Sequence, residues 1–177
     1  MSSFLLSVEG ISDQGAFEGL NTRLSQIIKS NQTNGNRPNK ICGYFKHRSG
    51  FSKYILCKDL HTFPIENINK IYNEAKGMLD DYDKPIFEKL VIQNAIEAWF
   101  LSDIDAINYV FNCNITTNVA NPESIENPDD YLTNLLRKQG KEYIKSKEIS
   151  KRIMMEMDLG LLQSKCSSYQ DFINIIT

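Results

Sequence analysis

The sequence predicts an α/β fold, with a mostly parallel sheet flanked by helices and a helical extension at the carboxyl end. Over about the first 112 residues, short apolar runs that suit buried strands alternate with amphipathic segments that suit helices. This alternation is typical of βαβ units and a parallel sheet. Beyond residue 112 the strand-like runs cease, and proline residues separate short helical segments.

The first strand is expected at residues 4–9, because Phe4-Leu5-Leu6-Ser7-Val8 is an almost continuous apolar run. Gly10 then predicts a turn, and Ser12 can cap a helix that opens at Asp13. Apolar residues near helical spacing predict that this first helix extends over residues 13–30.

Residues 31–39 contain Gly35 and Pro38 and are expected to form a loop. Pro64 suits the first turn of a helix, since its fixed φ angle is compatible with that position. The remaining elements of this region are predicted as strands at 41–45, 54–57 and 87–92, and as helices at 64–80 and 95–111.

The chain is predicted to divide into an α/β domain at residues 1–112 and a helical extension at 113–177 that packs on it. Helical segments are expected at 129–138, 146–157 and 169–176. Ser168 and Asp171 have the spacing of a capping box before the last of these helices.

The composition limits the class of protein. A chain of 177 residues with 41% hydrophobic residues suits one folded domain and excludes a disordered chain. No apolar run approaches the roughly 20 residues that span a bilayer, and Met1-Ser2-Ser3 lacks the features of a signal peptide. The four scattered cysteines form no C-x-x-C pair, which argues against a zinc or disulfide framework and favours a cytoplasmic location.

The charged residues are distributed unevenly, although the net charge is only −2. No Asp or Glu occurs from Gly19 to Lys58, and a second basic stretch covers residues 137–152. Such asymmetry is expected of a protein with one face against a polyanion. The residues expected to contact nucleic acid are Lys46, His47, Arg48 and Lys53, although a solvated basic loop is the ordinary alternative.

Three acidic residues follow predicted strands. Glu9 and Asp59 each end a strand, and Glu97 lies near the start of the helix after the last strand. The carboxyl ends of parallel strands share one edge of a sheet, where ligands bind in open α/β folds. Carboxylates gathered there repel one another unless a cation holds them, and Mg²⁺ and Mn²⁺ prefer oxygen ligands. The sequence therefore predicts a Mg²⁺ or Mn²⁺ site that contains these acids.

The run Val8-Glu9-Gly10-Ile11-Ser12-Asp13 resembles the first signature of the Toprim domain. This metal-dependent fold occurs in topoisomerases, bacterial primases and nucleases of the overcoming-lysogenisation-defect family. The resemblance implies that Glu9 acts in proton transfer and that Asp59 is the first acid of a metal-binding D-x-D motif. His61 stands at the position of the second acid, so either Glu97 completes the site, the metal preference has shifted towards a histidine ligand, or catalysis is lost.

The segments 96–103 and 122–128, together with Tyr143 and Lys145, resemble a family of small stand-alone bacterial Toprim-like proteins. Related stand-alone proteins occur beside ATPases in phage-defence loci. The resemblance therefore implies a partner ATPase of the ABC or overcoming-lysogenisation-defect type and a role as a nuclease effector. Since the sequence has no Walker A motif, any ATP dependence would come from that partner.

These observations lead to the hypothesis of a metal-dependent nuclease that hydrolyses DNA, tRNA or another RNA. Glu9, Asp59 and Lys58 are the expected catalytic residues, and Glu9, Asp59, His61 and Glu97 are the expected metal ligands. The alternative is a non-catalytic subunit that binds nucleic acid or a partner ATPase, which the absence of the second D-x-D acid favours. The sequence leaves open whether the chain forms a homo-oligomer.

Overall fold

Four strands form one sheet in the order β2-β1-β3-β4, and every neighbouring pair is parallel. The computed structural model describes residues 2–33, 37–46 and 48–177. The strands are β1 (Ser3–Val8), β2 (Ile27–Gln32), β3 (Lys53–Asp59) and β4 (Phe87–Ile92). Because all four run in the same direction, their carboxyl ends lie at one edge of the sheet.

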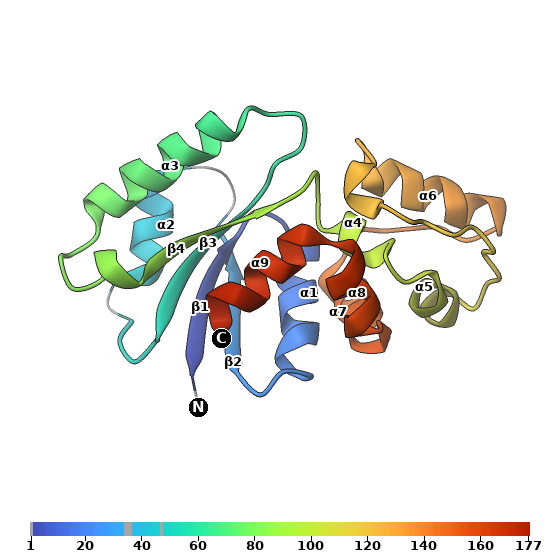
Figure 1. Cartoon of the computed structure of the whole chain (residues 1–177), viewed down its shortest axis with the longest axis horizontal. Coiled ribbons are helices and arrows are strands. Elements are labelled where there is room, and N and C mark those ends of the chain that lie inside the picture. Colours follow the sequence, from blue (N-terminus) through green and yellow to red (C-terminus); the bar gives the residue numbers. More distant parts are fainter. Residues whose placement is uncertain (1, 34–36, 47) are drawn as a thin grey trace.

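Helices cover both faces of the sheet, and further helices extend to one side of it (Figure 1). The helices of the first two thirds of the chain are α1 (Ile11–Asn21), α2 (Pro38–Phe45), α3 (Ile65–Met78), η1 (Lys84–Ile86), α4 (Glu97–Phe100) and α5 (Ile104–Phe111). Those of the last third are η2 (Pro122–Ser124), α6 (Pro128–Lys138), α7 (Lys147–Glu156), α8 (Leu159–Lys165) and α9 (Ser167–Ile176). The α/β class predicted from the sequence is confirmed.

The alternation of side chains along the strands creates two apolar cores. Leu6 and Val8 of β1 face a large core that includes α1 and α9, whereas Leu5 faces a smaller core formed with α2 and α3. In β3, Ile55 and Leu56 divide in the same way between the large and the small core. A strand buried on both faces reads as a continuous apolar run, which explains the composition of residues 4–8.

The predicted first helix is too long, because residues 27–32 form the edge strand β2. Ile27 and Ile28 continue the helical spacing of the apolar residues in α1, yet the chain turns and pairs with β1 in parallel. The side chain of Asn21 accepts a 2.6 Å hydrogen bond from the Ile28 amide. Pairing with the edge of β1 therefore determines the structure of residues 27–32, and the helical spacing of their apolar residues does not.

The predicted strand at 41–45 is wrong, since these residues belong to helix α2. Pro38 lies in the first turn, where its missing amide proton costs nothing. Ile41, Cys42 and Phe45 are buried on one face of the helix, and the Cys42 thiol donates to the Ala75 carbonyl of α3 at 3.0 Å. Short apolar runs are compatible with either element, so packing against α3 decided between them.

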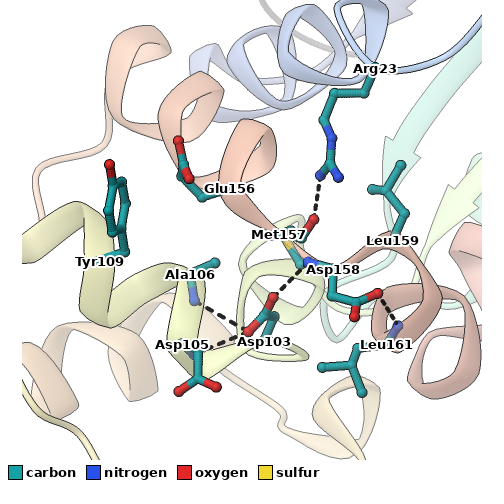
Figure 2. A pocket seen from close by; sticks show the side chains of 10 residues that line it. All are labelled: Arg23, Asp103, Asp105, Ala106, Tyr109, Glu156, Met157, Asp158, Leu159 and Leu161. Carbon is teal, nitrogen blue, oxygen red and sulfur yellow. Dashed lines mark hydrogen bonds between the residues drawn. The ribbon is translucent and has the colours of Figure 1, made fainter.

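The helix predicted at 95–111 is divided into α4 and α5 by a break at residues 101–103. Asp103 caps α5 by accepting hydrogen bonds from the amides of Asp105 and Ala106, at 3.1 and 3.2 Å. Its other oxygen accepts from the Asp158 amide at 2.7 Å, so one carboxylate joins α5 to the start of α8 (Figure 2). Asp103 and Asp158, two of the acids drawn in this figure, therefore act as helix caps.

The last third of the chain is helical and packs on the large core. Ser146 caps α7 by accepting from the Ile149 amide, in agreement with the helix predicted at 146–157. The capping box predicted for Ser168 and Asp171 does not occur, because α9 begins at Ser167 and Ser168 binds Glu123 instead. No helix in the described ranges is long and apolar enough to cross a membrane.

Candidate metal and phosphate site

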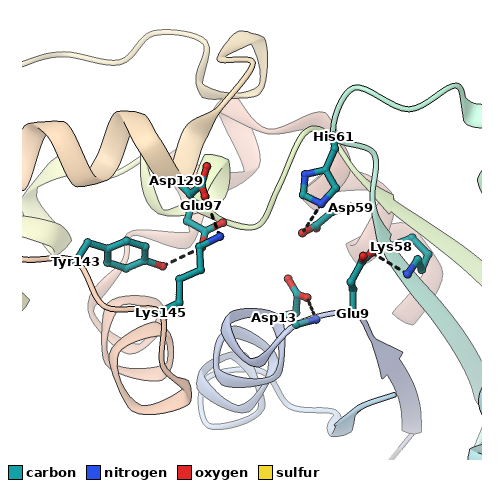
Figure 3. Close-up of polar contacts among 10 residues, drawn as sticks. Glu9, Asp13, Lys58, Asp59, His61, Glu97, Asp129, Tyr143 and Lys145 are labelled. Atoms are coloured by element: carbon teal, nitrogen blue, oxygen red, sulfur yellow. Dashed lines mark hydrogen bonds and ion pairs between the residues drawn. The ribbon is translucent and has the colours of Figure 1, made fainter. Parts of the chain in front are cut away.

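The first two candidate acids meet where β1 and β3 end. Glu9 follows Val8, the last residue of β1, and Asp59 is the last residue of β3. Glu97, the first residue of α4, lies on the far side of the same space (Figure 3). All three line one cavity of about 180 Å³ at the carboxyl edge of the sheet. The structure therefore brings together the acids that the sequence analysis grouped.

Glu9 is held by Lys58, whose ammonium group lies 2.7 Å from a carboxylate oxygen. Lys58 is only 3% exposed, and long charged side chains are seldom buried without a partner. Because Glu9 directly follows β1 and Lys58 lies in the adjacent strand β3, the ion pair holds Glu9 beside the end of β3. Lys58, one of the expected catalytic residues, thus lies beside the candidate acids.

Asp59 is nearly buried, with its side chain 10% exposed, and the His61 imidazole lies 3.9 Å from one of its oxygens. The other oxygen, Oδ1, is buried and has no hydrogen-bond partner among the described residues. Burial raises the pKa of Asp59 well above its usual range, and the charges of Asp13, Glu97 and Glu9 raise it further. A carboxyl group in such an environment is stabilised when it binds a proton or a cation.

Asp13 is a member of the cluster that the sequence analysis did not assign to the site. Gly10, and not Ser12, is the N-cap of α1, and the Asp13 side chain accepts from the Gly10 amide at 2.6 Å. Its Oδ1 atom is buried without a hydrogen-bond partner in the described part of the chain. Burial raises its pKa to about 7, and the nearby charges of Glu97 and Glu9 contribute.

A signal for Asp13 does exist in the sequence. The acid is four residues after Glu9, with a glycine turn between them. Because a helix starts at Ile11, position 13 lies in its first turn, where a carboxylate is directed back towards the preceding strand end. The E-G-x-S-D spacing predicts a helix start, and this accounts for the conformation of Asp13 but not for its place in the site.

Glu97 is 1% exposed and is held by residues from the last third of the chain. It accepts from the Tyr143 hydroxyl at 3.0 Å, and the Lys145 ammonium lies 3.4 Å away. Lys145 also pairs with Asp129 of α6 at 3.0 Å. Although burial alone would lower the pKa of Lys145, the carboxylates of Glu97 and Asp129 raise it above its ordinary value.

The loop expected to contact nucleic acid lies elsewhere. Lys53 begins β3 and is opposite Phe4 near the start of β1, so it lies at the amino edge of the sheet, away from Glu9 and Asp59. Its ammonium group donates to the Ile175 carbonyl at 2.7 Å. Lys46 and Arg48 precede it, and Arg48 stacks over the Tyr44 ring. His47 lies outside the described residues.

The acids do not form a ready-made metal site. In residues 2–33, 37–46 and 48–177, no three His, Cys, Asp or Glu side chains are arranged so that they could hold a metal ion. The four carboxylates line the same space but do not converge on a point. The buried Oδ1 atoms of Asp13 and Asp59, which lack hydrogen-bond partners there, are the oxygen donors that such a site would use.

Comparison with solved structures supports the fold. The C-terminal region of the Xanthomonas campestris pv. campestris OLD protein, phased with mercury, is similar at a TM-score of 0.50 and 12% identity, covering 98% of this chain and 96% of that chain. A platinum-phased structure of the same region gives a TM-score of 0.48 at 12% identity, covering 98% and 95%. At this identity, the likeness concerns the fold.

No curated protein matches the chain. A family model does match, and its description is Domain of unknown function (DUF4276). The match covers residues 8–177, which include the strand ends, α1, α4 and the helical last third that together surround the carboxylates. The chain therefore belongs to the DUF4276 family.

Proposed function

We propose that this protein is a divalent-cation-dependent nuclease that hydrolyses phosphodiester bonds at the carboxyl edge of its sheet. One observation carries the proposal. Four carboxylates from three parts of the chain, those of Glu9, Asp13, Asp59 and Glu97, line a single cavity. Two of them bury an oxygen atom that has no hydrogen-bond partner among the described residues.

A cation fits this donor set on chemical grounds. Gathering buried carboxylates is unfavourable, as the raised pKa values of Asp13 and Asp59 indicate. Carboxylate oxygens are the ligands preferred by Mg²⁺ and Mn²⁺, and His61 would suit Mn²⁺ better than Mg²⁺. Since the side chains of the described residues do not yet converge on one point, we expect binding to be accompanied by their rotation.

The residues around the acids suit phosphoryl chemistry. A divalent cation held by Glu9, Asp13 and Asp59 would polarise a phosphate and lower the pKa of a bound water. Lys145, half exposed and kept cationic by its carboxylate neighbours, is available to offset negative charge on the reacting phosphate. Tyr143 orients Glu97 through its hydroxyl group, and Lys58 holds Glu9 in place.

The biological setting is also part of the proposal. The Toprim resemblance supports nucleic acid as the substrate, and the fold likeness to the OLD protein is consistent with that resemblance. An effector role in antiphage defence beside an ATPase rests on the same resemblance. The sequence contains no Walker A motif, so any ATP dependence would come from a partner.

The first test is calorimetric titration of Mn²⁺ and Mg²⁺ into the wild type, Glu9→Gln and Asp59→Asn. Both substitutions are nearly isosteric, and the amide introduced by Glu9→Gln keeps an oxygen that can accept from Lys58. Asp81→Asn is the matched control, because the Asp81 side chain is 93% exposed. We expect saturable binding that both site variants weaken at least about 10-fold and that the control preserves. Folded protein that binds neither cation would contradict the proposal.

Cleavage of labelled DNA and tRNA is the second test. We expect Mn²⁺- or Mg²⁺-dependent cleavage that falls at least about 100-fold in Asp59→Asn, since the acid is proposed to act on the reacting centre. Circular dichroism spectra of all variants would check that the fold is retained. Cleavage by Asp59→Asn at the wild-type rate would rule out this site.

A specific observation favours a second candidate, a non-catalytic binding subunit. His61, which replaces the second acid of D-x-D, lies 3.9 Å from Asp59, and the described acids do not form a ready-made three-ligand group. If the wild type binds nucleic acid or an ATPase without cleaving nucleic acid in any cation, this candidate replaces the nuclease.

A further inference from the structure

A second cavity opens directly beside the carboxylates, on the α3 side. Its volume is about 150 Å³, and it shares Glu9, Asp59 and His61 with the carboxylate cavity. The rest of its lining is contributed by Lys58, Phe63, Asn67, Ile68 and Ile71. A group bound in this second cavity would therefore lie next to a group bound at the carboxylates.

The second cavity adds an apolar wall, made by Phe63, Ile68 and Ile71, to the charged residues that it shares with its neighbour. Phe63, in the loop after β3, is 60% exposed, whereas Ile68 of α3 is 4% exposed and forms a buried wall. The exposed Asn67 supplies an amide group with both a donor and an acceptor. The Phe63 ring, beside these polar groups, offers an apolar face on which a planar ring can stack.

The loop that carries Phe63 is held in place by backbone and side-chain bonds. The amide of His61, at a φ angle of 47°, donates to the Asn94 carbonyl at 2.9 Å. The Asn94 side chain in turn donates to the carbonyls of Glu123 and Ile125, at 3.0 and 2.7 Å. The rings of His61 and Phe63 meet edge to face, with centroids 6.3 Å apart. Left-handed backbone at non-glycine residues is uncommon and occurs often at functional sites.

We propose that the second cavity binds one nucleobase of the strand whose phosphate lies at the carboxylates, with the base stacked on Phe63. This inference rests on the proposed nuclease function and specifies its substrate. A cavity of roughly 150 Å³ accommodates one six-membered aromatic ring, as an engineered protein cavity of that size binds benzene. The base must leave a duplex to enter, so the preferred substrate is single-stranded or carries an unstacked base.

A pair of matched ligands tests the proposal in the full chain. One is a fluorescently labelled single-stranded oligothymidylate, and the other is an abasic oligomer of the same length and charge. Affinities would be measured by anisotropy in Ca²⁺, with gel analysis to check that the ligands stay intact. We expect the wild type to bind the oligothymidylate more tightly than the abasic oligomer, and Phe63→Ala to lose about 5- to 100-fold in affinity for the oligothymidylate alone.

Two controls separate stacking from other roles of the ring. Phe63→Tyr keeps the aromatic face and should retain the affinity, and Tyr82→Ala removes a 93% exposed aromatic residue outside this cavity and should change nothing. Equal affinity of the wild type for the two ligands, or an equal loss of affinity for both in Phe63→Ala, would overturn the proposal of a nucleobase pocket. Phe63 would then contact a protein partner or stabilise its loop.

The proposed function has its own readout in this experiment. Phe63→Ala should keep the wild-type Mn²⁺ titration, because the ring donates no metal ligand. If cation binding and cleavage persist while the base preference is absent, only the pocket is wrong. If neither oligomer binds and neither cation titrates, both proposals are wrong.

Discussion

The carboxyl group of Asp13 is buried beside other acids, and this gives a single residue a pH-dependent effect on stability. Its pKa is about 7 in the folded protein, first because of burial and then because of Glu97 and Glu9. In the unfolded chain it titrates near its ordinary value of about 4. Between these values the folded state holds the extra proton, so the free energy of unfolding falls as pH rises, by at most about 1.4 kcal/mol per unit. Asp59 acts in the same direction.

We therefore expect Asp13→Asn to stabilise the metal-free protein at about pH 8. Between about pH 5 and pH 8, its free energy of unfolding should decrease less steeply than that of the wild type. Urea denaturation in EDTA, followed by circular dichroism, measures this. Asp81→Asn is the control and should follow the wild type. A steeper pH dependence in Asp13→Asn, or identical curves for it and the wild type, would contradict the proposed environment of Asp13.

At the scale of elements, the contact between α1 and α7 depends on two glycines. A Cβ atom at Gly15 would lie 2.2 Å from the Lys147 carbonyl oxygen, and one at Gly19 would lie 2.8 Å from that of Lys151. Both obstacles are backbone atoms, so the two helices would have to separate. Because α1 carries Asp13 and α7 follows the segment with Lys145, this contact also positions the site.

We expect Gly15→Ala to destabilise the protein by about 1–3 kcal/mol, the usual cost of overpacking. Gly43→Ala is a matched control in helix α2, since a Cβ there meets nothing within 4 Å. It should stabilise the protein slightly, by up to about 1 kcal/mol, through loss of chain entropy in the unfolded state. Denaturation midpoints measure both effects. A neutral Gly15→Ala would show that α7 does not lie this close to α1.

At the scale of the whole molecule, the first two thirds and the last third share one core and one candidate site. Trp99, the only tryptophan, packs edge to face on Phe17 of α1 and on Tyr169 of α9, with centroids 5.9 and 5.2 Å apart. Its indole donates to the Ser168 hydroxyl at 2.8 Å. The carboxylates come from the first part of the chain, and Tyr143 and Lys145 come from the last.

We expect a single unfolding transition, in which the α/β domain at 1–112 and the helical extension at 113–177 unfold together. Tryptophan fluorescence reports on the shared core, and far-ultraviolet circular dichroism reports mainly on the helices. Their urea transitions should coincide, as they do for a two-state domain. Separate midpoints would mean that the helical extension unfolds independently.

Features that depend on local patterns follow from the sequence alone. Periodicity and capping act over a few residues, so a short segment is enough to predict them. Such features are the apolar runs at β1, β3 and β4, the acids near their ends and the Ser146 cap of α7. Parallel strand order then implied that Glu9, Asp59 and Glu97 would share an edge. The family resemblance adds the hypothesis of a nuclease.

Features that depend on distant neighbours required the folded chain. Residues 27–32 form a strand because β1 offers a free edge, and residues 38–45 form a helix because α3 buries one of its faces. The raised pKa of Asp13 and the contacts of Glu97 with Tyr143 and Lys145 arise across the whole chain. Burial and electrostatic interactions depend on distance in space, so no short segment of the sequence contains them.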